Sequence, residues 1–159
     1  MNWASSEPAA RTSVPATALD DIRMAFELFD AWEDTYRFVI DLGQEVAEMP
    51  PGQRTPAALV RGCQSQVWLH AHRDEGSGHV RFDIDSDAHI VRGLIAILLA
   101  VYDDHSPAEI VAFDIEGLFD ELGLLSHLSP TRGNGLRVIV QRIRAVARAA
   151  GDGHASTAK

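Results

Sequence analysis

The sequence has one cysteine, no apolar run long enough to cross a membrane, and few basic residues. The single cysteine, Cys63, excludes an intramolecular disulfide and any zinc site that needs several cysteines, and it is typical of a reducing compartment. The longest apolar run, 94–102, is far shorter than the roughly 18 residues that suggest a membrane span, and no signal-peptide core lies near the N-terminus. We therefore expect a soluble, cytoplasmic protein.

The deficit of positive charge restricts the possible partners. The chain has 14 Lys and Arg residues against 23 Asp and Glu residues, which gives a net charge of -9. Nucleic acid and anionic membranes repel such a chain as a whole, so neither is an expected partner without a local basic patch. The sequence leaves a homodimer open.

The length of 159 residues and the 46% of hydrophobic residues are typical of one globular domain. Residues 1–18 are rich in Ala, Ser, Thr and Pro without periodicity, and residues 151–159 are small and polar. Neither segment can bury much surface, so we expect a flexible N-terminal extension and a flexible tail. Residues 19–150 form the expected domain, with no internal repeat.

Helical periodicity dominates this domain. Apolar residues at helical spacing predict two helices that meet near Asp30, and Gly43 stands where a C-terminal glycine would end the second. Residues 88–102 are apolar nearly all round, which predicts a central helix that Ser86 or Asp87 can cap. Capping signals predict two further short helices, and an apolar stripe predicts a last helix after Pro130.

Alternating apolar and polar residues on either side of a Gly-rich turn predict a β-hairpin between these helices. With His72 opposite His79, Val67 pairs with Ile84, and the apolar residues of both strands share one face. Trp68 then lies on the opposite face, which should be partly covered. The expected fold class is α+β: a mainly helical single domain with a small antiparallel sheet.

Cys63 follows a proline-rich irregular connection and directly precedes the first strand. A lone cysteine is commonly a small buried hydrophobe. Three neighbouring features favour a displayed thiol instead: Gly62 permits a turn with positive φ, Arg61 adds positive charge that favours a thiolate, and Gln64 and Ser65 are too polar for a core segment.

Two clusters suggest metal ligands, and we prefer a simpler interpretation of both. Asp83, Asp85 and Asp87 alternate as calcium ligands do, but the glycine and glutamate of a calcium loop are missing, so we expect solvent-facing strand residues and a helix cap. The expected hairpin also places three histidines on one face, as zinc ligands would lie. Without a fourth ligand, an exposed polar face explains them equally well, and some can cover Trp68. These histidines are His70, His72 and His79.

Arg132 lies between two glycines and a Ser-Pro helix start. The local sequence is explained in part by helix capping. A planar cation beside the free N–H groups of a helix start also suits a negatively charged sulfur or carboxylate.

Three segments stand out together: VRGCQSQVW at 60–68, DSDAHIVRGL at 85–94 and HLSPTR at 127–132. They resemble the SufE family of sulfur-acceptor proteins. The similarity runs from about residue 32 through the last helix. Thr131 stands where the family often has Ser, and the N-terminal extension is not part of the pattern.

This resemblance implies a partner protein of a pyridoxal-phosphate-dependent (PLP) cysteine desulfurase in iron–sulfur cluster assembly, with Cys63 as the acceptor of the persulfide sulfur. It implies supporting roles for Asp87 and Arg132 around the cysteine, a hinge at Gly62, and an apolar cavity that shelters the loop of Gln64 and Ser65. It also implies downstream iron–sulfur scaffold proteins as recipients. No cofactor of its own is expected, and a sulfur-transfer partner is expected rather than a free-standing enzyme.

Two other classes of function remain open at this point. A thiol-dependent hydrolase would use Cys63 with a histidine base such as His70, His72 or His127. A pure adaptor would bind a partner without needing the thiol.

Overall fold

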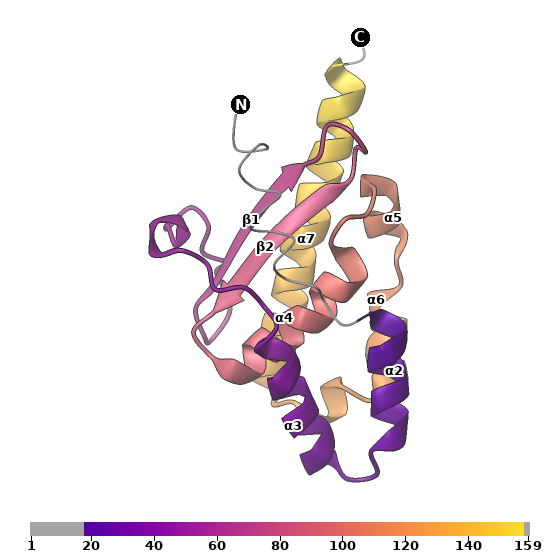
Figure 1. The fold of residues 1–159 in the computed structure, drawn as a ribbon. Coiled ribbons are helices and arrows are strands. Elements are labelled where there is room, and N and C mark those ends of the chain that lie inside the picture. The colour runs from indigo at the N-terminus through magenta and orange to yellow at the C-terminus, as the bar shows by residue number, and fades with distance from the viewer. Residues whose placement is uncertain (1–17, 158–159) are drawn as a thin grey trace.

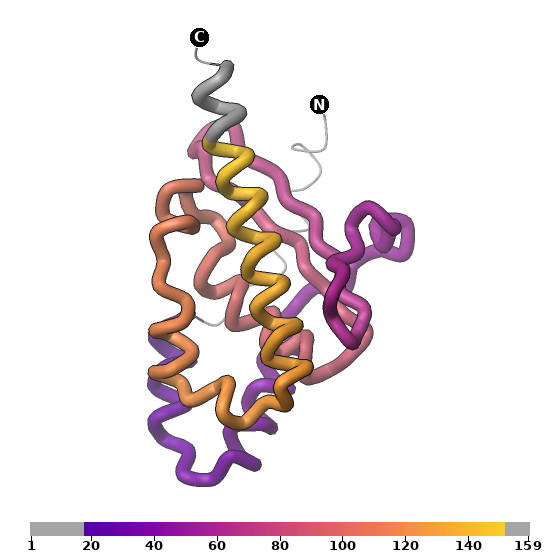
Figure 2. Tube along the Cα trace, turned by 180° about the vertical axis from the view of Figure 1, so that it is seen from behind, coloured from indigo at the N-terminus to yellow at the C-terminus, as the bar shows by residue number. Residues whose placement is uncertain are grey.

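The computed structural model describes residues 18–157, with side chains described for residues 18–151. A long antiparallel hairpin lies along the C-terminal helix, and the remaining helices pack beside them (Figures 1 and 2). The α+β class, mainly helical with one two-stranded antiparallel sheet, is confirmed. No helix of the described chain is both long enough and apolar enough to pass through a membrane.

The first two helices are α2 (Leu19–Leu28) and α3 (Trp32–Gly43), which confirms the predicted break near Asp30. Gly43 does not follow the end of α3, as the sequence suggested, but lies in its last turn. A Cβ atom at Gly43 would lie 2.7 Å from the backbone nitrogen of Gly93. Gly43 is therefore required for the close crossing of α3 over α4, not for a left-handed helix end.

The helix α4 (His89–Tyr102) occupies the centre of the domain, as its sequence predicts. Ten of its residues are buried. Neither Ser86 nor Asp87 caps it as expected, because its N-cap residue is Ala88, without a side-chain cap. The Asp87 carboxylate instead accepts a hydrogen bond from the backbone N–H of Gln66.

The strands β1 (Val67–Arg73) and β2 (Val80–Ser86) form the hairpin, with a register that differs from the predicted one. Leu69 pairs with Ile84 and Val67 pairs with Ser86. The turn accounts for the difference: the Asp74 carboxylate accepts hydrogen bonds from Ser77, and Asp74 and Gly78 are joined through their backbones at 2.7 Å. Because the shift is two residues, the same side chains still face the core.

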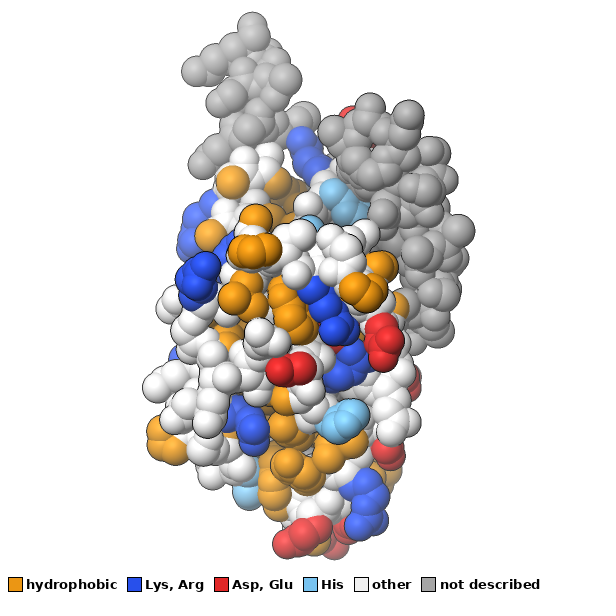
Figure 3. Space-filling view, turned by 90° about the vertical axis from the view of Figure 1, so that its left-hand side faces the viewer, with side chains coloured by type: hydrophobic (Ala, Val, Ile, Leu, Met, Phe, Trp, Pro, Cys, Tyr) orange, Lys and Arg blue, Asp and Glu red, His pale blue; other side chains and the backbone are white. Residues whose placement is uncertain are grey.

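The outer face of the hairpin is covered, as Trp68 predicts. Met49 and Ala58 of the connection between α3 and β1 pack on Trp68, which is 7% exposed. The Arg54 guanidinium lies 4.8 Å from the centre of the Trp68 ring. Figure 3 looks onto the side of the molecule where this connection lies, including its short 3-10 helix η1 (Pro51–Gln53).

The C-terminal half completes the core. It contains α5 (Pro107–Ala112), α6 (Ile115–Leu122), a 3-10 helix η2 (Leu125–His127) and α7 (Pro130–Thr157). The predicted capping signals are present: Ser106 and Glu109 form a capping box for α5, and Asp114 caps α6. The backbone is helical to Thr157, so the tail predicted to be flexible at 151–159 begins inside α7. The extension predicted at 1–18 lies outside the described residues, apart from Ala18.

Candidate functional site

Cys63 is carried by residues 61–65, the cysteine loop, which projects between β1 and α7 and is closed at its base. The backbone N–H of Val60 donates to the carbonyl of Val67 at 2.7 Å. At the other end, Gln66 is held at both backbone groups: its N–H donates to the Asp87 carboxylate at 3.1 Å, and its carbonyl accepts from the Ser86 hydroxyl at 2.7 Å. The ends of the cysteine loop are therefore fixed.

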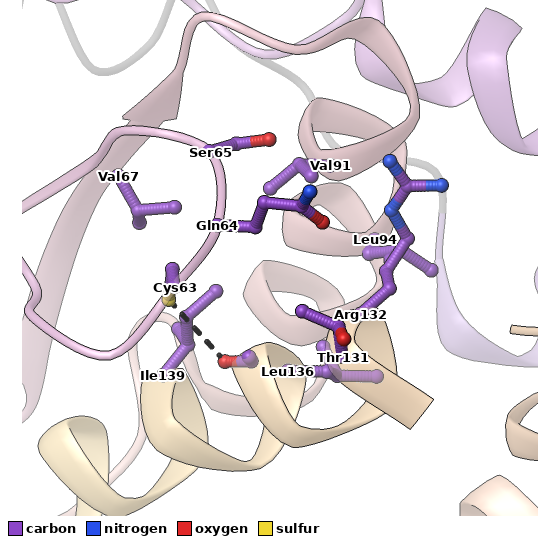
Figure 4. Close-up of a pocket in the computed structure, with 11 residues that line it drawn as sticks. Cys63, Gln64, Ser65, Val67, Val91, Leu94, Thr131, Arg132, Leu136 and Ile139 are labelled. Carbon is purple, nitrogen blue, oxygen red and sulfur yellow. Dashed lines mark hydrogen bonds between the residues drawn. The ribbon is translucent and has the colours of Figure 1, made fainter. Parts of the chain in front are cut away.

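The tip of the loop is held far more weakly. The Cys63 thiol donates to the carbonyl of Gly135 in α7, with 3.5 Å between Sγ and the oxygen (Figure 4). This is the one hydrogen bond that links residues 61–65 to the rest of the described chain. A thiol is a weak donor, so the closed position depends mainly on apolar packing.

Gly62 has φ = 98°, in the region that side-chain-bearing residues rarely adopt. A Cβ atom there would meet the two methyl groups of Val138 at 3.5 Å, which is ordinary contact. The requirement for glycine is therefore conformational rather than steric, and the positive φ expected from the sequence is confirmed.

The Cys63 side chain faces a small cavity of about 20 Å³. Its inner wall is apolar, while Gln64, Ser65, Thr131 and Arg132 line the polar side. In Figure 4 the Arg132 guanidinium points away from Cys63. The inner wall comes from β1, α4 and α7: Val67, Val91, Leu94, Gly135, Leu136 and Ile139.

Burial raises the pKa of the Cys63 thiol. Among the described residues no positive charge offsets this effect, so the expectation that Arg61 favours a thiolate is wrong for this conformation. Arg61 is exposed and lines a separate groove on the α7 side of the loop. In the closed loop, Cys63 is a protonated and poorly nucleophilic thiol at neutral pH.

The three aspartates of the 83–87 segment do not share one environment. Asp85 was expected to face solvent, but it is fully buried. Its carboxylate accepts hydrogen bonds from the side chains of Arg54 and Arg92 and from the backbone N–H of Met49. Asp85 therefore fixes the α3–β1 connection, while the exposed Asp87 holds the base of the cysteine loop.

None of the described histidines lines the Cys63 cavity. His70 Nε2 lies 2.7 Å from the carbonyl of Gln53, His79 pairs with Asp104, and His127 stacks on the Trp32 ring at 4.2 Å. A histidine base for a thiol-dependent hydrolase is therefore missing from the described part of the cavity. Within the described residues, no three His, Cys, Asp or Glu side chains converge as metal ligands would.

Gly62, Gln64, Ser65 and Arg132 lie around Cys63, and Asp87 lies at the base of the cysteine loop, where it holds Gln66. The structure adds two residues that were not singled out. The sequence indicates Ser86 only as a possible helix cap and Gly135 only as a glycine near Arg132. Ser86 bonds to Gln66 at the base of the cysteine loop and Gly135 bonds to Cys63 at its tip, and these tertiary contacts join residues 20 and 72 positions apart in the chain.

Comparison with known proteins gives a consistent family. The model of the SufE family, described as an Fe-S metabolism associated domain, matches residues 20–147. The chain is 47% identical over 133 residues to uncharacterized SufE-like proteins of Rhizobium meliloti (strain 1021) and Rhizobium etli, covering 82% of this chain and 95% and 90% of theirs.

The fold has a counterpart among solved structures. A hypothetical protein from Thermus thermophilus, known from its solution structure, superimposes with a TM-score of 0.66 at 23% sequence identity. The match covers 82% of this chain and 93% of the other. At this identity the likeness concerns the fold alone.

Proposed function

The chain belongs to the SufE family, whose description links it to Fe–S metabolism, and on this basis we propose that Cys63 accepts persulfide sulfur from a PLP-dependent cysteine desulfurase. The chain would act in the cytoplasm as a carrier, and iron–sulfur scaffold proteins would receive the sulfur next. The observation that carries the proposal is the position of Cys63: a thiol on a weakly held loop, facing a small apolar cavity.

The cavity suits the product as well as the thiol. A cavity needs roughly 10–15 Å³ to hold one water molecule, and this one has about 20 Å³. The persulfide product adds one atom, the second sulfur, to the Cys63 side chain, so space on this scale is what the product needs. The apolar wall of α4 and α7 would exclude water from this sulfur.

The transfer is a thiol exchange. The Cys63 thiolate attacks the outer sulfur of the persulfide on the desulfurase cysteine, the new bond joins that sulfur to Cys63 Sγ, and the bond between the two sulfurs on the enzyme breaks. The desulfurase cysteine leaves as a thiolate, so Cys63 ends as a persulfide with no net oxidation or reduction. The carrier needs no cofactor for this step.

The raised pKa of Cys63 lowers the fraction of thiolate in the closed loop, so opening of the loop would favour the reaction. The fixed ends at Val60 and Gln66 and the positive φ of Gly62 favour a swing of residues 61–65 as one unit. In this proposal Asp87 fixes the base of the cysteine loop while residues 61–65 move. Gln64 and Ser65 cover the opening of the cavity, and Arg132 contacts the desulfurase.

A sulfide-release assay with the cognate desulfurase and cysteine tests the proposal. The wild-type chain should stimulate release, and Cys63→Ser should abolish stimulation while its thermal unfolding matches the wild type. Full stimulation by Cys63→Ser would support a thiol-independent adaptor and overturn the acceptor role. Turnover of a peptide-like electrophile without any desulfurase would instead support a hydrolase.

A further inference from the structure

A second depression lies on the other side of the cysteine loop from the Cys63 cavity. It is an open groove of about 430 Å³ between the end of the α3–β1 connection and α7. Five of its eight lining residues are apolar, and its charged residues are Arg61 and Arg142. The full lining is Pro56, Ala57, Leu59, Val60, Arg61, Val138, Gln141 and Arg142.

Two neighbouring arginines without an ion pair among the described residues are unusual in a chain with a net charge of -9. The ion pairs of the described residues include neither Arg61 nor Arg142, although Arg142 donates a hydrogen bond to the carbonyl of Ala57 at 3.3 Å. No carboxylate of residues 18–151 lines the groove. In Figure 3 the left edge of the view, on the side of α7, carries basic side chains and no acidic ones among the described residues.

The groove is continuous with the loop that carries the sulfur. Arg61 is the first residue of the cysteine loop, and Val138, which lines the groove, has both methyl groups within contact distance of the position of a Cβ atom on Gly62. Arg132, also without a carboxylate partner in the described chain, lies at the cavity on the opposite side. Unpaired guanidinium groups therefore flank the cysteine loop on both sides.

We propose that the groove receives an acidic segment of the desulfurase, with Asp or Glu side chains on Arg61 and Arg142 and an apolar side chain on the floor. This inference rests on the proposed function, since it identifies the partner surface that fits beside Cys63. Charge complementarity favours this occupant over a second copy of the chain, because two copies with a net charge of -9 repel each other. A side chain of the partner that contacts Val138 and Gly62 would displace the cysteine loop, so docking in the groove would promote its opening.

The test is a titration of the cognate desulfurase with Arg61→Glu and Arg142→Glu, in parallel with Arg148→Glu. Arg148 is exposed on the same helix as Arg142 and lies outside the groove. Because Arg148→Glu changes the charge by the same amount as Arg142→Glu, it is the matched control. Each groove variant should raise the concentration for half-maximal stimulation about tenfold or more, and the control should stay within about twofold. The maximal rate at saturation should be retained, and added salt should weaken the wild type more than the groove variants.

Equal titrations for the groove variants and Arg148→Glu would overturn the inference. An effect of the groove variants on self-association in sedimentation, with an unchanged desulfurase titration, would also overturn it, because the groove would then bind a second copy. The Arg61 side chain has no hydrogen bond to lose within the described chain, so Arg61→Glu keeps the test valid if Arg142→Glu unfolds. Failure of the proposed function is separate, since it would appear as full stimulation by Cys63→Ser.

Discussion

The two parts of the α3–β1 connection have similar irregular backbones but are held in different ways. Residues 44–60, the anchored segment, are tied to the core through the buried Asp85 carboxylate, its two arginines and the packing on Trp68. The cysteine loop, which follows directly, has one weak hydrogen bond from its tip to α7. Local stability differs across one structure in this way, and the elements that move come from its weakly held parts.

The contrast also separates the roles of polar groups. At the anchored segment, the buried Asp85 carboxylate of β2 accepts hydrogen bonds from Arg54, Arg92 and the backbone of Met49, so these contacts specify the position of the chain. In the cysteine loop, the polar contacts lie at the base, on Ser86 and Asp87, and the tip rests on apolar surface. A loop built in this way can open without breaking its anchoring hydrogen bonds.

The largest expected effect comes from breaking the anchored segment with Asp85→Ala. This change removes a buried carboxylate and leaves Arg92 without its charged partner, which should lower the free energy of unfolding by about 3–5 kcal/mol. Chemical denaturation measures the loss. Asp83→Ala, in the same strand at a partly exposed position, is the control and should cost far less. Equal losses would show that the Asp85 network does not anchor the connection.

A smaller effect is expected from Gly62→Ala in the cysteine loop. The positive φ costs a residue with a Cβ atom about 1–2 kcal/mol, and a weakly held loop can avoid this cost by opening. We therefore expect faster alkylation of Cys63 and a loss of at most this size in the free energy of unfolding. Gly52→Ala is the control, because Gly52 has no positive φ and open space around its Cβ position. Alkylation at the wild-type rate in Gly62→Ala would contradict the hinge.

Arg132→Ala should separate binding from stability at the rim of the cavity. Arg132 is partly exposed, and its side chain has no ion pair in the described chain, so its loss should change the free energy of unfolding by no more than about 0.5 kcal/mol. The concentration for half-maximal stimulation of the desulfurase should rise about tenfold or more. Thermal unfolding beside a desulfurase titration decides this, with Arg148→Ala as the control. A large loss of melting temperature with unchanged titration would make Arg132 a structural residue.

The pH dependence of alkylation should report the closed loop directly. Because burial raises the pKa of the folded Cys63 thiol, the unfolded chain loses this proton first as pH rises. The contribution of this thiol to the free energy of unfolding is therefore fully present below the pKa of Cys63 in the unfolded chain. It is lost as the pH rises through the pKa of Cys63 in the folded chain. Rates with iodoacetamide should have a higher midpoint pH in the native chain than in concentrated urea, and desulfurase should increase the native rate. Identical midpoints would contradict burial of the thiol.

Sequence reasoning succeeded where structure depends on neighbouring residues. The capping box of Ser106 and Glu109 and the positive φ of Gly62 are local, and both are present. The hairpin register was wrong because hydrogen bonds that Asp74 accepts from Ser77 and Gly78 place the turn one residue later in the chain, which alternation alone does not show. The burial of Asp85 was missed because its partner Arg54 is 31 residues away and belongs to a connection without periodicity.

The same difference between local features and tertiary contacts applies to the cysteine site. The pattern around Cys63 predicted a thiol on a loop, but the charge of Arg61 suggested a more acidic thiol than the structure has. Whether a side chain beside a cysteine in sequence also faces its sulfur depends on the turn at Gly62, which directs Arg61 into the groove and Cys63 into the cavity.

Mass spectrometry of Cys63 is the most direct test of the acceptor role. After incubation with the cognate desulfurase and cysteine, the chain should gain about 32 Da, one sulfur atom, which a reductant removes and which maps to Cys63. Cys63→Ser should gain nothing under the same conditions. An unmodified Cys63 in a reaction where the chain stimulates sulfide release would contradict the account.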